Sequence, residues 1–89
     1  MIEAYVFSSP TCAPCSQMKP IFADLKEEFP SFLWRTVDVG TNPTLVSKLE
    51  VTKIPSMVVV HNDKIVGRHH GTEVGHYFRI LRAAAVLSK

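Results

Sequence analysis

Two cysteines, Cys12 and Cys15, stand three residues apart, separated by Ala13 and Pro14. The β-branched and aromatic segment Ile2–Phe7 before them predicts a short strand, and the apolar spacing after them predicts a helix over about residues 12–29. A cysteine in the first turn of a helix faces unpaired N–H groups and the positive end of the helix dipole, which favour thiolate over thiol. One turn along, a second thiol is close enough to attack a mixed disulfide. The pattern predicts redox chemistry, with Cys12 as the exposed nucleophile and Cys15 as the inner, resolving thiol.

Other uses of the cysteine pair are less well supported. A structural zinc site needs four ligands, and the remaining candidates do not stand at zinc-finger spacing from the cysteines; they are His61, His69, His70 and His76. A purely structural disulfide in so short a loop would restrict little of the unfolded chain. Two inert buried thiols remain an alternative, but a pair flanked by Pro10 and Pro14 on a polar loop makes a poor core. We therefore expect a redox-active Cys12–Cys15 disulfide, with no metal and no other cofactor.

Length and composition bound the class of protein. Eighty-nine residues allow one domain, residues 1–89, and 46% hydrophobic with 20% charged residues are typical of a globular chain. The net charge is only +2 and there is no basic block, so nucleic acid is not an expected partner. The longest wholly apolar run, Ala83–Leu87, is far shorter than the roughly 20 residues of a membrane helix, and the N-terminus does not resemble a secretory signal. We expect a cytoplasmic monomer without a membrane partner.

The elements that must position the cysteines follow from the hydrophobic pattern. Further strands are expected at residues 32–39, 57–60 and 65–68, a short helix after Asn42-Pro43, and a last helix after Gly71. The order is βαβαββα. A strand–helix–strand start favours a right-handed parallel crossover, and the second half ends in a hairpin and a packing helix. We expect a four-stranded mixed sheet with helices on both faces.

The order and spacing of several motifs resemble the thioredoxin-fold family over nearly the whole chain. The motifs are Val6-Phe7 before Cys12-Ala13-Pro14-Cys15, Pro20 in the helix, Val37–Pro43, Val51–Ser56 before an apolar strand, and Gly71 before the final helix. The resemblance implies an α/β, thioredoxin-like fold in a minimal form that lacks the family's usual N-terminal strand and helix. It also implies disulfide exchange with protein substrates.

The resemblance implies a substrate-binding surface around the cysteines. Pro55 matches the family's cis-proline, which faces the cysteine pair, and an Ile–Pro bond prefers trans by only roughly 0.5–1 kcal/mol, so a fold can hold it cis. The backbone of Ile54 and Pro55 is expected to pair with an extended substrate, next to the Gly71 region. The other predicted substrate contacts flank the cysteines and are Thr11, Ala13 and Pro14.

The sequence also departs from the thioredoxin pattern. Val6 and Thr36 fall where thioredoxins carry a buried Asp, thought to help deprotonate the resolving thiol, and its neighbouring Lys; the sequence shows no replacement acid. The short layout is similar to a glutaredoxin, but Ala-Pro between the cysteines is closer to the Gly-Pro of thioredoxins than to the Pro-Tyr of glutaredoxins. Thr11 replaces the aromatic residue that usually precedes the first cysteine.

Three functional interpretations follow. The leading one is a small dithiol–disulfide oxidoreductase that reduces protein disulfides and is restored by an enzyme like thioredoxin reductase or by glutathione. The second is a glutaredoxin-like protein reduced by glutathione. The third, from another class, is a thioredoxin-fold binding module in a larger assembly, with an incidental redox pair.

Other notable residues are expected to have ordinary roles. We interpret Lys19 and Lys53 as solvated lysines and His69-His70 as an exposed pair at a strand end. Trp34 is expected in the core because it lies in mid-strand.

Overall fold

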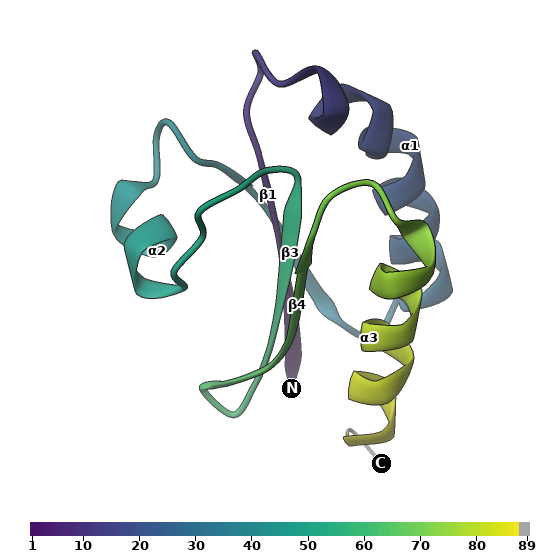
Figure 1. Ribbon diagram of the computed structural model, residues 1–89. Coiled ribbons are helices and arrows are strands. Elements are labelled where there is room, and N and C mark those ends of the chain that lie inside the picture. The colour runs from purple at the N-terminus through teal and green to yellow at the C-terminus, as the bar shows by residue number, and fades with distance from the viewer. Residues whose placement is uncertain (88–89) are drawn as a thin grey trace.

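The computed structural model describes residues 1–87 and contains the predicted order of elements (Figure 1). These are β1 (Ile2–Ser8), α1 (Ala13–Glu28), β2 (Leu33–Asp38), α2 (Pro43–Lys48), β3 (Ser56–His61), β4 (Lys64–His70) and α3 (Val74–Leu87). The predicted domain, residues 1–89, includes two residues outside the described range, and its extent stays a prediction.

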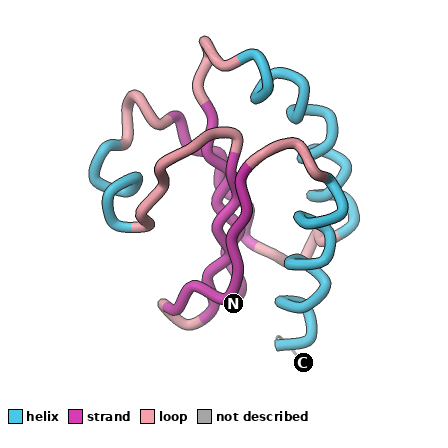
Figure 2. The backbone as a smooth tube through the Cα atoms, viewed as in Figure 1, coloured by secondary structure: helices cyan, strands magenta, loops and turns pink. Residues whose placement is uncertain are grey.

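The four strands form one mixed sheet in the order β2-β1-β3-β4. Strand β1 runs parallel to β2 and antiparallel to β3, and β3 pairs antiparallel with β4. The strands make one twisted layer (Figure 2), with α1 and α3 on one face and α2 on the other (Figure 1). The four-stranded mixed sheet with helices on both faces is therefore confirmed.

The core lies in two layers because successive strand residues point to opposite faces of the sheet. On the α1 and α3 side, Met57 and Val59 pack in the larger cluster, which also contains Phe22 and Tyr77 at a ring-centroid distance of 5.0 Å. Val58, on the opposite face of the same strand, belongs to the smaller cluster on the α2 side. Strand β3 is thus buried on both faces, which explains its nearly continuous apolar sequence.

Helix α3 lies very close to β4 at one point. A Cβ atom added to Gly67 would lie 2.5 Å from Cγ2 of Ile80. Glycine at this position therefore lets the helix approach the strand, and a larger residue would require the Ile80 side chain or the helix to shift.

Strand β2 is more exposed than the sequence predicted. It is an edge strand, and only Val37 among its residues is buried. Trp34 is half-buried: its ring packs against the larger core cluster, and its Nε1–H donates to the Phe29 carbonyl at 3.0 Å. The prediction of a core tryptophan was therefore only partly right, because an edge strand leaves part of a large ring open to solvent.

Candidate active site

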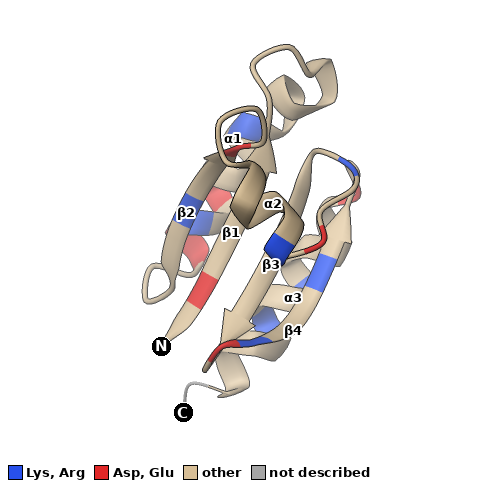
Figure 3. Cartoon of the chain, turned by 90° about the vertical axis from the view of Figure 1, so that its left-hand side faces the viewer, with Lys and Arg blue, Asp and Glu red and all other residues tan. Residues whose placement is uncertain are grey.

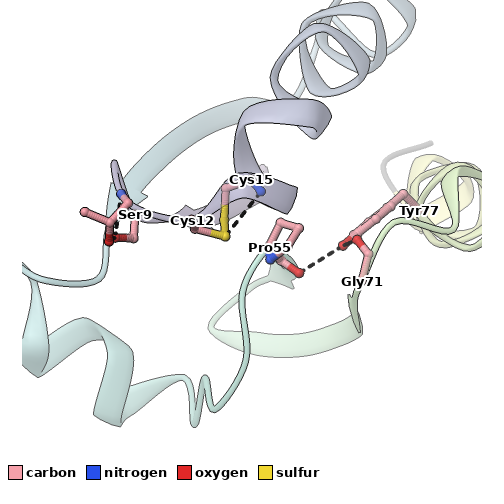
Figure 4. The surroundings of a disulfide bond; sticks show 7 residues. Ser9, Cys12, Cys15, Pro55, Gly71 and Tyr77 are labelled. Carbon is pink, nitrogen blue, oxygen red and sulfur yellow. Dashed lines mark hydrogen bonds between the residues drawn. A yellow bond between two sulfur atoms is a disulfide. The ribbon is translucent and has the colours of Figure 1, made fainter.

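Three loops meet at one end of the sheet because of the strand directions. Strand β1 ends where β3 begins, with Phe7 paired to Ser56, and Ser56 is also paired to His70 at the end of β4. The loops that follow β1, precede β3 and follow β4 therefore lie together. They carry the cysteine pair, Pro55 and Gly71 (Figure 4).

The two cysteines form a disulfide at the N-terminus of α1, with their Cα atoms 5.2 Å apart. Cys12 has an extended backbone and is the N-cap residue, and its Sγ accepts a hydrogen bond from the Cys15 N–H at 3.2 Å. Pro14 fits in the first turn because that turn needs no intrahelical N–H. Since the cap sulfur faces free N–H groups and the positive helix end, negative charge on Cys12 is stabilised there.

The two sulfurs differ in access to solvent. Cys15 is buried, with 4% of its surface exposed, whereas Cys12 is half-buried and the neighbouring Thr11, Ala13 and Pro14 are exposed. This is the burial expected of an outer, attacking sulfur and an inner, resolving one. The roles of all five residues in exchange and substrate binding stay predictions.

Pro55 lies between the cysteine pair and Gly71 (Figure 4). The Ile54–Pro55 peptide bond is cis, as the family resemblance implied. Pro55 is buried and lines a cavity of about 210 Å³ together with Cys15. Its carbonyl accepts the Gly71 N–H at 2.9 Å, so two of the predicted substrate-binding residues are directly joined.

Tyr77, in α3, also reaches these two residues. Its hydroxyl donates to the Gly71 carbonyl at 2.7 Å and lies 3.3 Å from the Pro55 carbonyl oxygen (Figure 4). Burial, and to a lesser extent the charge of Glu73, raises the pKa of Tyr77 to about 12. The hydroxyl therefore stays protonated at neutral pH. Sequence reasoning missed this role because the hydrophobic period of α3 shows only that position 77 faces the core.

The prediction of an exposed His69-His70 pair was wrong for His69. His69 is half-buried, its Nε2 lies 2.9 Å from Glu73 Oε1, and its ring stacks on His76 with centroids 4.6 Å apart. The hydrogen bond with His69 lowers the pKa of the Glu73 carboxyl. These contacts depend on how α3 folds back onto β4, which the strand-end position does not reveal. His70 is exposed, as expected.

Two lysines lie beside Cys15. Lys19 and Lys26 line the 210 Å³ cavity next to it, together with Val6 and Thr36, the residues at the positions of the thioredoxin Asp and Lys. Lys26 Nζ donates to Thr36 Oγ1 at 3.5 Å. Lys19 is exposed but lines the cavity beside Cys15, so it is not merely a remote solvated lysine.

One carboxylate near the cysteines was overlooked. Asp38, at the end of β2, lines a second cavity of about 290 Å³ that also contacts Cys15 and Lys19. Its Oδ1 accepts the Gly40 N–H at 2.8 Å. The expectation of no replacement acid considered only the positions of the thioredoxin pattern. The parallel pairing of Ser8 with Asp38, which brings this carboxylate to the cysteine end of the sheet, was needed to find it.

The rest of the described chain adds little to the site. Lys53 is exposed, as predicted. Within residues 1–87, no three His, Cys, Asp or Glu side chains are grouped so that they could hold a metal ion, and no helix is long and apolar enough to cross a membrane. On the α2 side, basic and acidic positions are interspersed (Figure 3).

The fold and the capped Cys-x-x-Cys disulfide define a thioredoxin-type chain. A sequence profile described as Thioredoxin matches residues 4–79, and the protein belongs to the thioredoxin family. Thioredoxin H5 of Oryza sativa subsp. japonica is 35% identical over an alignment of 68 residues that covers 72% of this chain and 50% of that protein. Putative thioredoxin H10 of Arabidopsis thaliana is 31% identical over 81 residues, 91% of this chain and 53% of that protein. The chain thus spans about half the length of these relatives.

Solved structures show the same fold. Thioredoxin from Trypanosoma brucei brucei superposes with a TM-score of 0.89 at 24% identity, covering 97% of this chain and 76% of that one. Thioredoxin from Fasciola hepatica superposes with a TM-score of 0.86 at 26% identity, covering 92% of this chain and 79% of that one. The thioredoxin-like fold is confirmed, and the thioredoxin interpretation fits these relatives better than the glutaredoxin one.

Proposed function

We propose that this protein is a dithiol–disulfide oxidoreductase of the thioredoxin type that reduces disulfides in protein substrates. The observation that carries the proposal is the cap position of Cys12, whose sulfur is bonded to Cys15 and accepts the Cys15 N–H at the start of α1. A sulfur placed there is a good thiolate and hence both a nucleophile and a leaving group. Membership of the thioredoxin family supports the same activity.

The proposed reaction starts from the reduced protein. The Cys12 thiolate attacks one sulfur of a substrate disulfide, forming a mixed disulfide and releasing the other substrate sulfur as a thiolate, which takes up a proton. Cys15 then loses its proton and attacks the Cys12 sulfur, which breaks the mixed disulfide and releases the second substrate thiolate. Two electrons pass to the substrate, and the protein is left with the Cys12–Cys15 disulfide present in the structure.

Substrate is proposed to lie across the exposed side of the cysteine loop. The residues next to the outer sulfur are exposed and therefore free to contact the substrate; they are Thr11, Ala13 and Pro14. The backbone of both Ile54 and Pro55 was expected to pair with an extended substrate. Pro55 has no N–H and its carbonyl already accepts from two donors, so the pairing is proposed for the backbone of Ile54 alone. Gly71 would complete the surface on the α3 side.

The electron donor is proposed to be an enzyme of the thioredoxin-reductase class. A structural neighbour, thioredoxin f2, was crystallised in complex with ferredoxin:thioredoxin reductase, with a TM-score of 0.87 to this chain. Glutathione is the alternative donor. We further propose a monomer working in a reducing compartment such as the cytoplasm, where a dithiol of this kind is kept reduced.

The test supplies each donor separately. Oxidised protein is mixed with insulin, NADPH and thioredoxin reductase, or with insulin, NADPH, glutathione and glutathione reductase. We expect NADPH consumption and insulin precipitation in the first mixture, and little of either when Cys12 and Cys15 are both serine. Activity only in the glutathione mixture would favour the glutaredoxin interpretation, and inactivity in both would contradict the proposal.

A further inference from the structure

The buried hydroxyl of Tyr77 reaches two separate loops at the cysteine end of the sheet. Tyr77 has no exposed surface, and it lies on α3, whereas its two acceptors come from the loop before β3 and the loop after β4. Its O–H bonds the Gly71 carbonyl at 2.7 Å and lies 3.3 Å from the Pro55 carbonyl. With the Gly71 N–H bonded to the same Pro55 carbonyl at 2.9 Å, three groups form one closed set of contacts.

We propose that Tyr77 is a positioning residue that holds the Pro55 and Gly71 segments at the separation that an extended disulfide substrate requires. This inference rests on the proposed function and assigns to Tyr77 a part in substrate binding through the backbone of these two segments. Tyr77 is not assigned a contact with the sulfurs or a part in the exchange steps themselves.

The ring of Tyr77 is held independently of its hydroxyl. It packs edge-on against Phe22, with centroids 5.0 Å apart, and edge-on to His69 at the same distance. Such packing fixes a phenylalanine as well as a tyrosine. The hydroxyl is therefore not needed to keep α3 in place, and its geometry is explained by the two carbonyls that it reaches.

Gly71 needs an external restraint because of its backbone. Its φ of +116° is a conformation that only glycine adopts freely, and glycine is also the residue with the most conformational freedom to lose. The Tyr77 O–H fixes its carbonyl while its own N–H is bonded to Pro55. Loss of the hydroxyl should leave the Gly71 segment free to sample other conformations, only some of which bind substrate.

The experiment compares the wild type with Tyr77→Phe and with Tyr5→Phe. Tyr5→Phe is the matched control, since it also removes one tyrosine hydroxyl, which bonds Glu3 at 2.8 Å on the α2 side of the sheet. Initial rates are measured against the concentration of a peptide disulfide and, separately, for the small disulfide DTNB. Amide hydrogen exchange of Gly71 and of Val59 is followed in the same proteins.

We expect Tyr77→Phe to raise the KM for the peptide about fivefold at unchanged kcat, the order expected for the loss of one hydrogen bond. Its rate with DTNB should be unchanged, and the Gly71 amide should exchange faster while Val59 does not. Tyr5→Phe should match the wild type in every measurement. Because phenylalanine keeps the ring contacts with Phe22 and His69, Tyr77→Phe should remain folded, and its near-UV circular dichroism should show a retained tertiary structure.

An unchanged KM in Tyr77→Phe would overturn the proposal. So would an equal loss towards the peptide and DTNB, or an equal effect of Tyr5→Phe, because each would indicate a general structural change. A wild type inactive towards peptide disulfides would contradict the proposed function instead. The exchange rate of the Gly71 amide would still decide whether Tyr77 holds that segment.

Discussion

The Cys12 sulfur lies 3.2 Å from the backbone nitrogen of Cys15 and accepts its N–H, so the first cysteine caps the helix on which the second stands. Cys15 is at the same time buried beneath the loop, with 4% of its surface exposed. One sulfur is thus stabilised as an anion near the surface, and the other is shielded from solvent. This difference leads to the first two predictions.

In the reduced protein, iodoacetamide should alkylate Cys12 at neutral pH and leave Cys15 unmodified. The thiolate is the reactive form, and only Cys12 is both at the helix N-terminus and accessible. The measurement is mass spectrometry of peptides after timed alkylation, with a denatured sample, in which both thiols should react, as the control. Equal rates in the folded protein would contradict the assignment.

Cys15→Ser should trap substrates that Cys12→Ser does not. Without the resolving thiol, the Cys12 mixed disulfide cannot be broken from within the protein. Non-reducing and reducing gels of the two variants, after incubation with a peptide disulfide, make the comparison. A better trap in Cys12→Ser would reverse the roles of the two sulfurs.

A biological activity that survives the double serine variant would favour the binding-module interpretation.

Val6→Asp should speed the release of product from the mixed disulfide. Val6 is buried and lines the same cavity as Cys15, Lys19 and Lys26, so a carboxylate there could accept the Cys15 proton and face two basic side chains. Burying an ionisable group there should lower the free energy of unfolding by several kcal/mol. Stopped-flow release of a peptide is the measurement, and Val6→Asn, equal in shape without the base, is the control. Equal rates in the two variants would count against this role.

Alkaline pH should destabilise the wild type more than Tyr77→Phe. Burial is the main cause that raises the pKa of Tyr77 from 10.0 to about 12. Because the folded pKa is the higher one, the stabilisation is complete below pH 10 and is lost as the pH rises from 10 towards 12, where the unfolded chain ionises first. Between pH 9 and roughly pH 11.5, the free energy of unfolding measured with urea should fall by about 2 kcal/mol more in the wild type than in Tyr77→Phe. Tyr5 is present in both proteins, so parallel losses would contradict the prediction.

Much of the fold could be predicted from local sequence. The apolar period of α1, the Asn-Pro start of α2 and the continuous apolar strand β3 each reflect nearest-neighbour constraints on the chain. The site at the level of Cys12, Cys15 and Pro55 could also be predicted, because the cysteine spacing has a direct chemical meaning and the order of motifs resembles one family.

The features that were missed depend on contacts between distant segments. A tyrosine and a phenylalanine fit the hydrophobic period of a helix equally well, so the pattern does not show why position 77 needs a hydroxyl. Its carbonyl partners are identified only once α3 packs beside the two loops. His69 bonds Glu73 across the turn between β4 and α3, and Asp38 reaches the cysteine end through the parallel register of β1 and β2. None of these contacts leaves a periodic signal in the sequence.

The close approach at Gly67 has a practical consequence for engineering. Because Ile80 and Tyr77 anchor the inner side of α3, the outer side of the helix is separate from the site, and there Phe78, Arg82 and Val86 are exposed. A fluorophore, an affinity tag or a surface tether attached at Arg82 or Val86 would point into solvent, away from the sulfurs. Immobilised forms of the protein made through this side of the helix should keep the cysteine loop open to large substrates.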